Sequence, residues 1–81
     1  MRDVDVIHQI ESVMAEEDAL YRRAEGGHGL ADAERERLRG LQAHLDQCWD
    51  LLRQRRARRE FGEDPDRARP RPIDTVEHYQ Q

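Results

Sequence analysis

The sequence predicts an all-α protein, an antiparallel two-helix hairpin of the coiled-coil type. Three observations predict it. Apolar residues recur every three or four positions in a row along residues 31–61, a second such row covers residues 3–25, and three glycines separate the two rows. Spacings of three and four place side chains on one face of an α-helix. Two helices with matching apolar faces and a short break between them fold back on each other.

The first predicted helix covers residues 3–25. Asp3 and Asp5 lie in its first turn, where negative charge interacts favourably with the helix dipole. Two neighbouring rows of apolar residues make a face that is wider than one adjacent helix covers. The inner row is Val6, Ile10, Val13 and Leu20, and the second row is Ile7, Met14 and Tyr21.

The second predicted helix covers residues 31–61 and is the longer of the two. Three glycines within residues 26–30 predict the turn before it, because glycine weakens helices and adopts left-handed conformations readily. Gly62 is expected to end this helix in a left-handed cap. Its inner face consists of Leu38, Leu41, Leu45, Cys48 and Leu52.

The remaining residues, 63–81, form a tail that contains proline and arginine. Its prolines prevent a continuous helix, which predicts an irregular connector. Asp74 and Glu77 have the spacing of a helix start, so a short helical turn is possible at residues 74–79. We expect this turn either to dock on the hairpin or to fray.

The apolar rows also predict the register of the hairpin. Matching the inner faces pairs residues whose numbers sum to 58, such as 10 with 48 and 13 with 45. The same register brings two acidic residues opposite two arginines, although charge was not used to set it. Agreement between independent patterns supports the fold. The charged pairs are Asp3 with Arg55 and Asp5 with Arg53.

We expect the hairpin to form a homodimer. An 81-residue chain with 36% hydrophobic and 40% charged residues has little apolar surface to bury, and its single cysteine excludes an internal disulfide. Two copies with closed two-fold symmetry form a four-helix bundle and cover the second apolar row. The expected dimer interface is Ile7, Met14, Tyr21, Trp49 and Leu51.

Composition and motifs exclude several function classes. The chain has no apolar run of about 20 residues, no signal-peptide layout, no zinc-finger spacing and no phosphate-binding glycine loop after a strand. We therefore expect a soluble cytoplasmic protein without cofactor, metal or catalytic residues, which is not an enzyme.

Three polar positions on the inner faces leave a metal-binding bundle as a distant alternative. Glu17 interrupts the inner row of the first helix and is expected to pair with His44 or bend towards water. His44 and Cys48 are four residues apart, a spacing that is able to hold zinc. Packing remains the favoured role, because free cysteines commonly fill apolar cores.

The densest site-like feature is the run RQRRARR at residues 53–59, in a chain whose net charge is −4 and whose basic residues are all arginine. The second helix extends past the start of the first, so the last arginines are expected to face no part of it. We expect an acidic protein partner to bind there; the alternative is nucleic acid or another polyanion bound through Arg53–Arg59, and the structural reading is a solvated helix end. The expected partner-binding residues are Arg56, Arg58 and Arg59.

Residues 45–72 carry the motif LDQCWDLLRQRRARREFGEDPD followed by ARPRP. This motif resembles a family of small actinobacterial proteins of unknown function, and the similarity extends over most of the chain. The resemblance implies a bacterial cytoplasmic setting. No activity, cofactor or catalytic residue comes with it.

Overall fold

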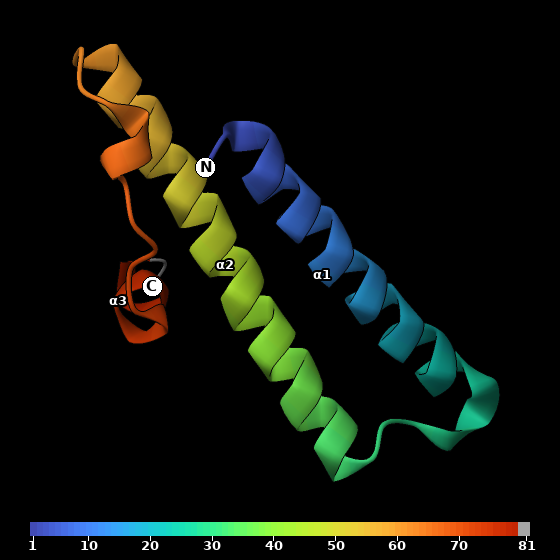
Figure 1. Ribbon diagram of the computed structural model, residues 1–81. Coiled ribbons are helices and arrows are strands. Elements are labelled where there is room, and N and C mark those ends of the chain that lie inside the picture. The colour runs from blue at the N-terminus through green and yellow to red at the C-terminus, as the bar shows by residue number, and fades with distance from the viewer. Residues whose placement is uncertain (80–81) are drawn as a thin grey trace.

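The structure is a computed structural model that describes residues 1–79, with side chains described for residues 1–26 and 29–76. Helix α1 (Asp3–Arg23) and helix α2 (Asp32–Glu60) lie side by side and run in opposite directions (Figure 1). All other regular structure in the described residues is also helical. The predicted all-α hairpin is confirmed.

Each long helix has an acidic residue in its first turn that accepts a hydrogen bond from a backbone N–H. Asp5 Oδ2 accepts a hydrogen bond from the Arg2 N–H at 2.7 Å, and Glu34 Oε1 accepts one from the Ala31 N–H at 3.1 Å. The first N–H groups of a helix lack partners within it, and negative charge at this end favours the helix dipole. These acids therefore set where each helix starts.

The connection between the helices differs from the predicted turn. Helix α1 ends at Arg23, and Ala24–His28 form one wider π-helical turn, so Gly26 continues the coil instead of breaking it. The chain reverses at Gly29, whose φ of 64° and ψ of −168° lie in a region open essentially to glycine alone. The break in the helix is thus later than the first glycine.

Gly62 ends α2 as predicted. Its φ is 73°, which is the left-handed region that favours glycine. The Glu63 N–H donates to the Arg58 carbonyl at 2.7 Å, and the Gly62 N–H donates to the Arg59 carbonyl at 3.2 Å. This pair of bonds is the Schellman motif, and it turns the chain back towards the body of the molecule.

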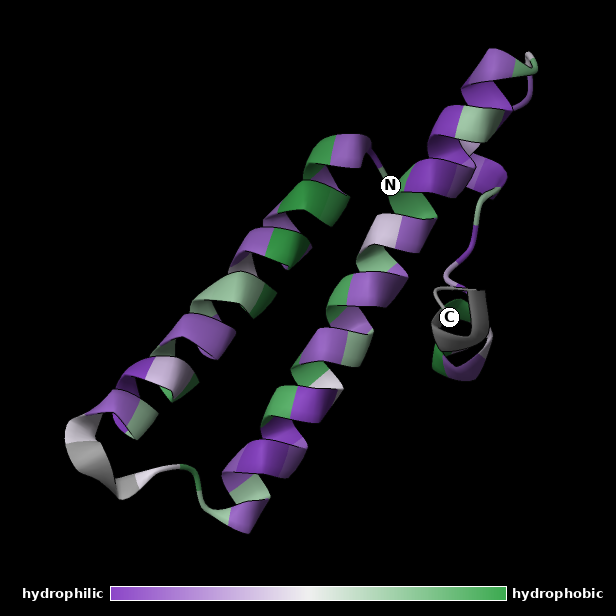
Figure 2. Ribbon diagram, turned by 180° about the vertical axis from the view of Figure 1, so that it is seen from behind, coloured by the Kyte–Doolittle hydropathy of each residue, from purple (hydrophilic) through white to green (hydrophobic). Residues whose placement is uncertain are grey.

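The core lies mainly between α1 and α2 and consists of two clusters that share Leu45. One cluster also contains Leu51 and Ala68, where the C-terminal segment covers α2. The cluster near the N-terminus of α1 contains both Ile10 and Cys48, as expected when paired residue numbers sum to 58. Figure 2 shows apolar residues recurring along both helices, whereas the end of α2 beyond α1 is mostly hydrophilic. The nine expected inner-face residues all lie in the clusters: Val6, Ile10, Val13, Leu20, Leu38, Leu41, Leu45, Cys48 and Leu52.

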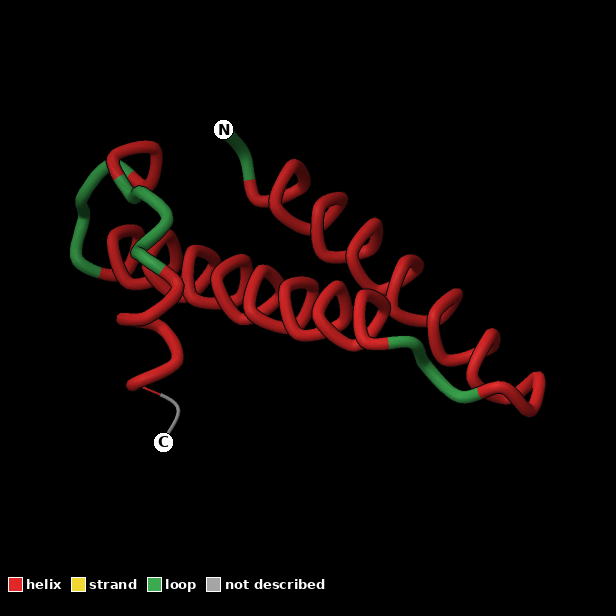
Figure 3. Tube along the Cα trace, turned by 90° about the horizontal axis from the view of Figure 1, so that it is seen from below, coloured by secondary structure: helices red, strands yellow, loops and turns green. Residues whose placement is uncertain are grey.

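The C-terminal segment folds back along α2 on the side away from α1 (Figures 1 and 3). It contains a 3₁₀ turn, η2 (Pro65–Arg67), and a short helix, α3 (Ile73–Tyr79). Ala68 and Val76 are buried. The segment therefore docks on the hairpin, which is one of the two expected outcomes, and α3 lies where the sequence predicted a short helical turn. The connector before it is irregular apart from η2.

Two glutamines of α2 attach this segment through its backbone. Gln47 Nε2 donates to the Arg71 carbonyl at 2.8 Å, and Gln54 Nε2 donates to the Arg69 carbonyl at 3.0 Å. Proline-containing chain has few backbone donors, so side chains supply the hydrogen bonds that a helix would make internally.

In the described part of the chain, no helix is long and apolar enough to cross a bilayer.

Candidate functional site

The arginine run contains one buried residue, Arg55, which holds three segments together. Arg55 is only 4% exposed. Its Nε donates to Asp3 Oδ1 at 2.6 Å, and its Nη1 donates to the Pro65 carbonyl at 3.2 Å and to Asp66 Oδ1 at 3.1 Å. The predicted Asp3–Arg55 pair is confirmed. The hydrogen bond to Asp3, supported by Asp66, raises the pKa of Arg55 against the opposing effect of its desolvation.

The predicted second pair does not form in the same way. Asp5 accepts the Arg2 N–H instead, and Arg53 lies 3.9 Å from Asp50 on its own helix. Asp5 is thus used to begin α1, and Arg53 remains largely exposed. The register predicted from the apolar rows holds, but only one of its two charged pairs is made.

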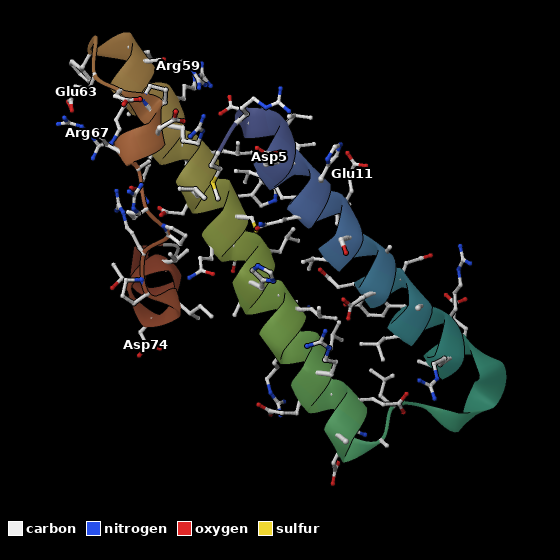
Figure 4. The ribbon with its side chains drawn as sticks, viewed as in Figure 1. Asp5, Glu11, Arg59, Glu63, Arg67 and Asp74 are labelled. Carbon is white, nitrogen blue, oxygen red and sulfur yellow. The ribbon has the colours of Figure 1, made fainter. Side chains whose placement is uncertain are left out.

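Arg59 was expected to face no part of α1, and this prediction is wrong. Its Nη1 and Nη2 donate to the two carboxylate oxygens of Asp3 at 3.1 and 2.8 Å. Figure 4 shows Arg59 on the side of α2 that faces the start of α1, with Glu63 and Arg67 on the opposite side. Arg59 and then Arg55 lower the pKa of Asp3 by hydrogen bonding. Arg59 therefore joins Arg55 in holding the end of α2 against the start of α1, here called the hairpin closure.

The other two expected partner-binding arginines have only weak partners. Arg56 Nε lies 3.3 Å from Glu60 Oε1, and Arg58 Nη1 lies 3.4 Å from Glu63 Oε1. Exposed ion pairs of this kind contribute about 0–1 kcal/mol and are screened by salt. A stronger anionic ligand is able to displace them, so Arg56 and Arg58 remain available for binding.

Four large apolar side chains form a second candidate surface along one side of the hairpin, here called the apolar flank. The Tyr21 hydroxyl and Gln42 Nε2 lie 3.5 Å apart, which places the Tyr21 row of α1 and the Gln42 row of α2 on the same side. Residue 49 follows residue 42 by seven positions, hence by two helical turns. The flank residues are 42–53% exposed: Ile7, Met14, Tyr21 and Trp49.

Leu51 does not belong to this exposed surface, and its assignment to the dimer interface is wrong. It is 3% exposed and lies in the same core cluster as Cys48 and Ala68. The C-terminal segment, which turns back after Gly62, covers this face of α2. The apolar character of Leu51 is therefore satisfied within one chain.

The polar positions on the inner faces show no described metal centre. Among the side chains that the structure describes, no three His, Cys, Asp or Glu residues are grouped to hold an ion. Cys48 is buried, with Sγ 3.8 Å from Gln9 Oε1, and burial raises the pKa of its thiol. Glu17 Oε1 is buried without a hydrogen-bond partner, and His44 is partly buried.

Asp50 is a structural site that the sequence analysis missed. It is 6% exposed, accepts a hydrogen bond from Gln54 Nε2 at 2.9 Å, and lies 3.5 Å from Arg71 Nε. It therefore links α2 to the C-terminal segment from the side opposite α1. The available signal was the spacing of Gln47, Leu51 and Gln54, which defines a second face of α2 at helical intervals.

Comparison with known proteins places the whole chain in one family. The model of a family described as a protein of unknown function, DUF2630, matches residues 2–81. Uncharacterized proteins of Mycobacterium bovis and of two strains of Mycobacterium tuberculosis are each 46% identical over 77 residues, covering 95% of this chain and 88% of theirs. No solved structure matches the chain. The resemblance to an actinobacterial family of unknown function is confirmed.

Proposed function

The chain belongs to the DUF2630 family of unknown function, and we propose that it acts as a small, self-associating helical interaction protein of the cytoplasm rather than as an enzyme. The observation that supports this proposal is the apolar flank, where four large side chains remain 42–53% exposed along one side of the hairpin. Contiguous exposed apolar surface is characteristic of interaction sites.

A second copy is the partner that fits this flank. The flank has three residues on α1 and Trp49 on α2, and the C-terminal segment covers a different side of α2. Two hairpins placed flank to flank make a four-helix bundle, in which each helix packs on two neighbours. The interface is then the same surface on both copies, as two-fold symmetry requires.

Light scattering tests the self-association directly. We expect wild-type protein at tens of micromolar to have twice the mass of one chain. The double variant Met14→Glu and Tyr21→Glu is expected to be a helical monomer that unfolds at a lower temperature, because it loses the stabilisation that association provides. A well-folded wild-type monomer at this concentration contradicts the proposal.

A matched control separates loss of the flank from added charge. Ala15 and Ala19 are exposed residues of α1 that do not belong to the flank. The variant Ala15→Glu and Ala19→Glu introduces the same two charges into the same helix. We expect it to remain a dimer. If it dissociates as readily as the flank variant, net repulsion and not the apolar contact controls association.

We further propose that Arg56 and Arg58, here called the arginine end, bind an acidic protein partner. Nucleic acid is the alternative ligand. Arg56 and Arg58 support this proposal, since the Arg56 pair is exposed and the partly exposed Arg58 lies 3.4 Å from Glu63. Arginine suits bidentate binding of carboxylate or phosphate. The net charge of −4 favours a protein partner over a nucleic acid.

Exchanging both arginines for glutamine tests the arginine end without disturbing the closure by Arg59. The variant Arg56→Gln and Arg58→Gln is expected to keep its helicity and lose retention of acidic proteins in a pull-down from native lysate. Salt-dependent retention on single-stranded DNA, lost in the same variant, supports nucleic acid instead. Zinc that remains bound after purification supports the distant alternative of a metal-binding bundle at His44 and Cys48.

A further inference from the structure

An open groove lies where the chain leaves α2 and turns back. It has a volume of about 210 Å³ and is bordered by the last two turns of α2 and by the returning segment. The α2 positions in its wall are spaced by three and four, so they form one face of the helix. The groove is lined by Gln54, Ala57, Arg58, Phe61, Glu63 and Arg71.

The groove combines cationic and apolar groups. The side chains of Arg58 and Arg71 are each about one-third exposed, and Phe61 is 80% exposed at its edge. Arg71 is held by Asp50 at 3.5 Å, which fixes its guanidinium next to α2. Phe61 is the most exposed large apolar residue of the chain's described part, and nothing in the hairpin core requires it there.

One carboxylate already occupies the cationic side of the groove. Glu63 Oε1 lies 3.4 Å from Arg58 Nη1, and the Glu63 side chain is more than half exposed. The distance is long for a charge-assisted hydrogen bond, which is usually 2.7–2.9 Å. Arg58 therefore receives a carboxylate in this conformation without binding it tightly.

We propose that this groove binds a short acidic segment of a partner protein. A glutamate or aspartate of the partner replaces Glu63 on Arg58, and a neighbouring apolar residue of the partner packs on Ala57 and Phe61. The proposal rests on the acidic-partner function of Arg56 and Arg58, and it narrows the specific contact to Arg58.

A carboxylate fits the groove better than a phosphate chain. Glu63 already places a carboxylate beside Arg58, and the net charge of −4 disfavours a ligand that carries many phosphates. The occupant expected from charge and shape together is an acidic peptide that contains an apolar residue.

Fluorescence anisotropy with a labelled peptide of four glutamates around one leucine tests the groove. We expect Arg58→Gln to weaken binding about tenfold or more, the usual effect of losing a hydrogen bond between charged groups. Arg22→Gln removes the same charge at the far end of the hairpin and is expected to change affinity less than about twofold. Thermal unfolding of each variant verifies that it folds.

A second variant tests whether Glu63 acts as an internal competitor. Glu63→Gln removes the carboxylate from Arg58 and is expected to strengthen peptide binding about threefold or more. Replacing the peptide leucine with serine is expected to weaken binding to wild type and to have less effect on Phe61→Ser. Unchanged affinity in Glu63→Gln overturns the displacement of Glu63.

Other outcomes separate this inference from the arginine-end function. If Arg56→Gln and Arg58→Gln each lower the affinity for the peptide equally, the arginine end binds acidic ligands without a defined site, and the groove is not the site. If wild type does not bind the peptide but retains acidic proteins from lysate through Arg56 and Arg58, the groove fails and the broader function stands. Displacement of the peptide by oligothymidine at equal charge overturns the preference for carboxylate.

Discussion

Arg55 and Arg56 are neighbours in the sequence, yet they differ in nearly every physical respect. Arg55 is 4% exposed and binds Asp3, Asp66 and the Pro65 carbonyl, whereas the Arg56 side chain is 77% exposed and lies near Glu60 alone. Successive residues of a helix point about 100° apart, so one residue faces α1 and the next faces water. A run of like residues therefore contains both structural and ligand-accessible members, and only the fold separates them.

The largest expected effect is the loss of the buried arginine. Arg55→Gln removes the hydrogen bonds from α2 to the start of α1 and to η2, and it leaves the Asp3 carboxylate with Arg59 as its guanidinium partner. Breaking a buried ion pair usually costs 3–5 kcal/mol, but Asp3 and Asp66 are partly exposed, so we expect about 2–3 kcal/mol. Urea denaturation measures this loss as a lower midpoint with an unchanged slope. A loss below about 1 kcal/mol contradicts the structural role of Arg55.

The pH dependence of stability sharpens the same comparison. The pKa of Asp3 is lowered from its ordinary value of 3.8 by Arg59 and Arg55, so the unfolded state takes up a proton more readily than the folded state. This stabilisation is present above pH 3.8 and is lost as the pH falls through the lowered value. We expect Asp3→Asn to be less stable than wild type near neutral pH.

Stability measured at acidic pH distinguishes the contribution of Asp3 from general acid unfolding. Urea midpoints measured between pH 6 and pH 2 are expected to fall less steeply in Asp3→Asn than in wild type, because the variant lacks the titrating group. Asp18→Asn is the matched control, since Asp18 forms only an exposed ion pair with Arg22 within α1. Equal slopes in wild type and Asp3→Asn contradict the proposed contribution.

The sequence predicts the seam between α1 and α2 because both helices repeat apolar residues at helical spacing over many turns. One row therefore constrains the other, and the register follows. The same argument fails for Ala68 and Val76, because their segment is too short for an apolar row to repeat over many turns. Gln47 and Gln54 hold this segment by bonding to its backbone carbonyls. The helical spacing of these glutamines marks a second face of α2, but it does not identify the segment that covers this face.

The wrong predictions for Leu51 and Arg59 have separate physical causes. Leu51 was assigned to a second copy because the hairpin alone leaves it uncovered, and the C-terminal segment turned out to cover it. Arg59 was left without a partner because pairing by register gives it a position before the start of the chain. An arginine side chain is long enough to reach back one helical turn, and Asp3 is able to bind two guanidinium groups at once.

The smallest expected effects come from the two outer arginines, and their difference decides whether the closure extends past Arg55. Arg59 makes two hydrogen bonds to Asp3 at 3.1 and 2.8 Å, but its side chain is nearly half exposed. We expect Arg59→Gln to cost about 0.5–1 kcal/mol, at the upper end for exposed pairs, since its geometry is bidentate. Arg56 pairs with Glu60 within one helix, where such pairs contribute about 0.3–0.5 kcal/mol. Chemical denaturation of the two single variants at low and high salt measures both, and the Arg59 effect is expected to persist better at high salt because Asp3 is less exposed than Glu60. If both variants lose the same stability at low salt and none at high salt, Arg59 has no structural role beyond an exposed ion pair. Arg55 is then the last residue of α2 that closes the hairpin.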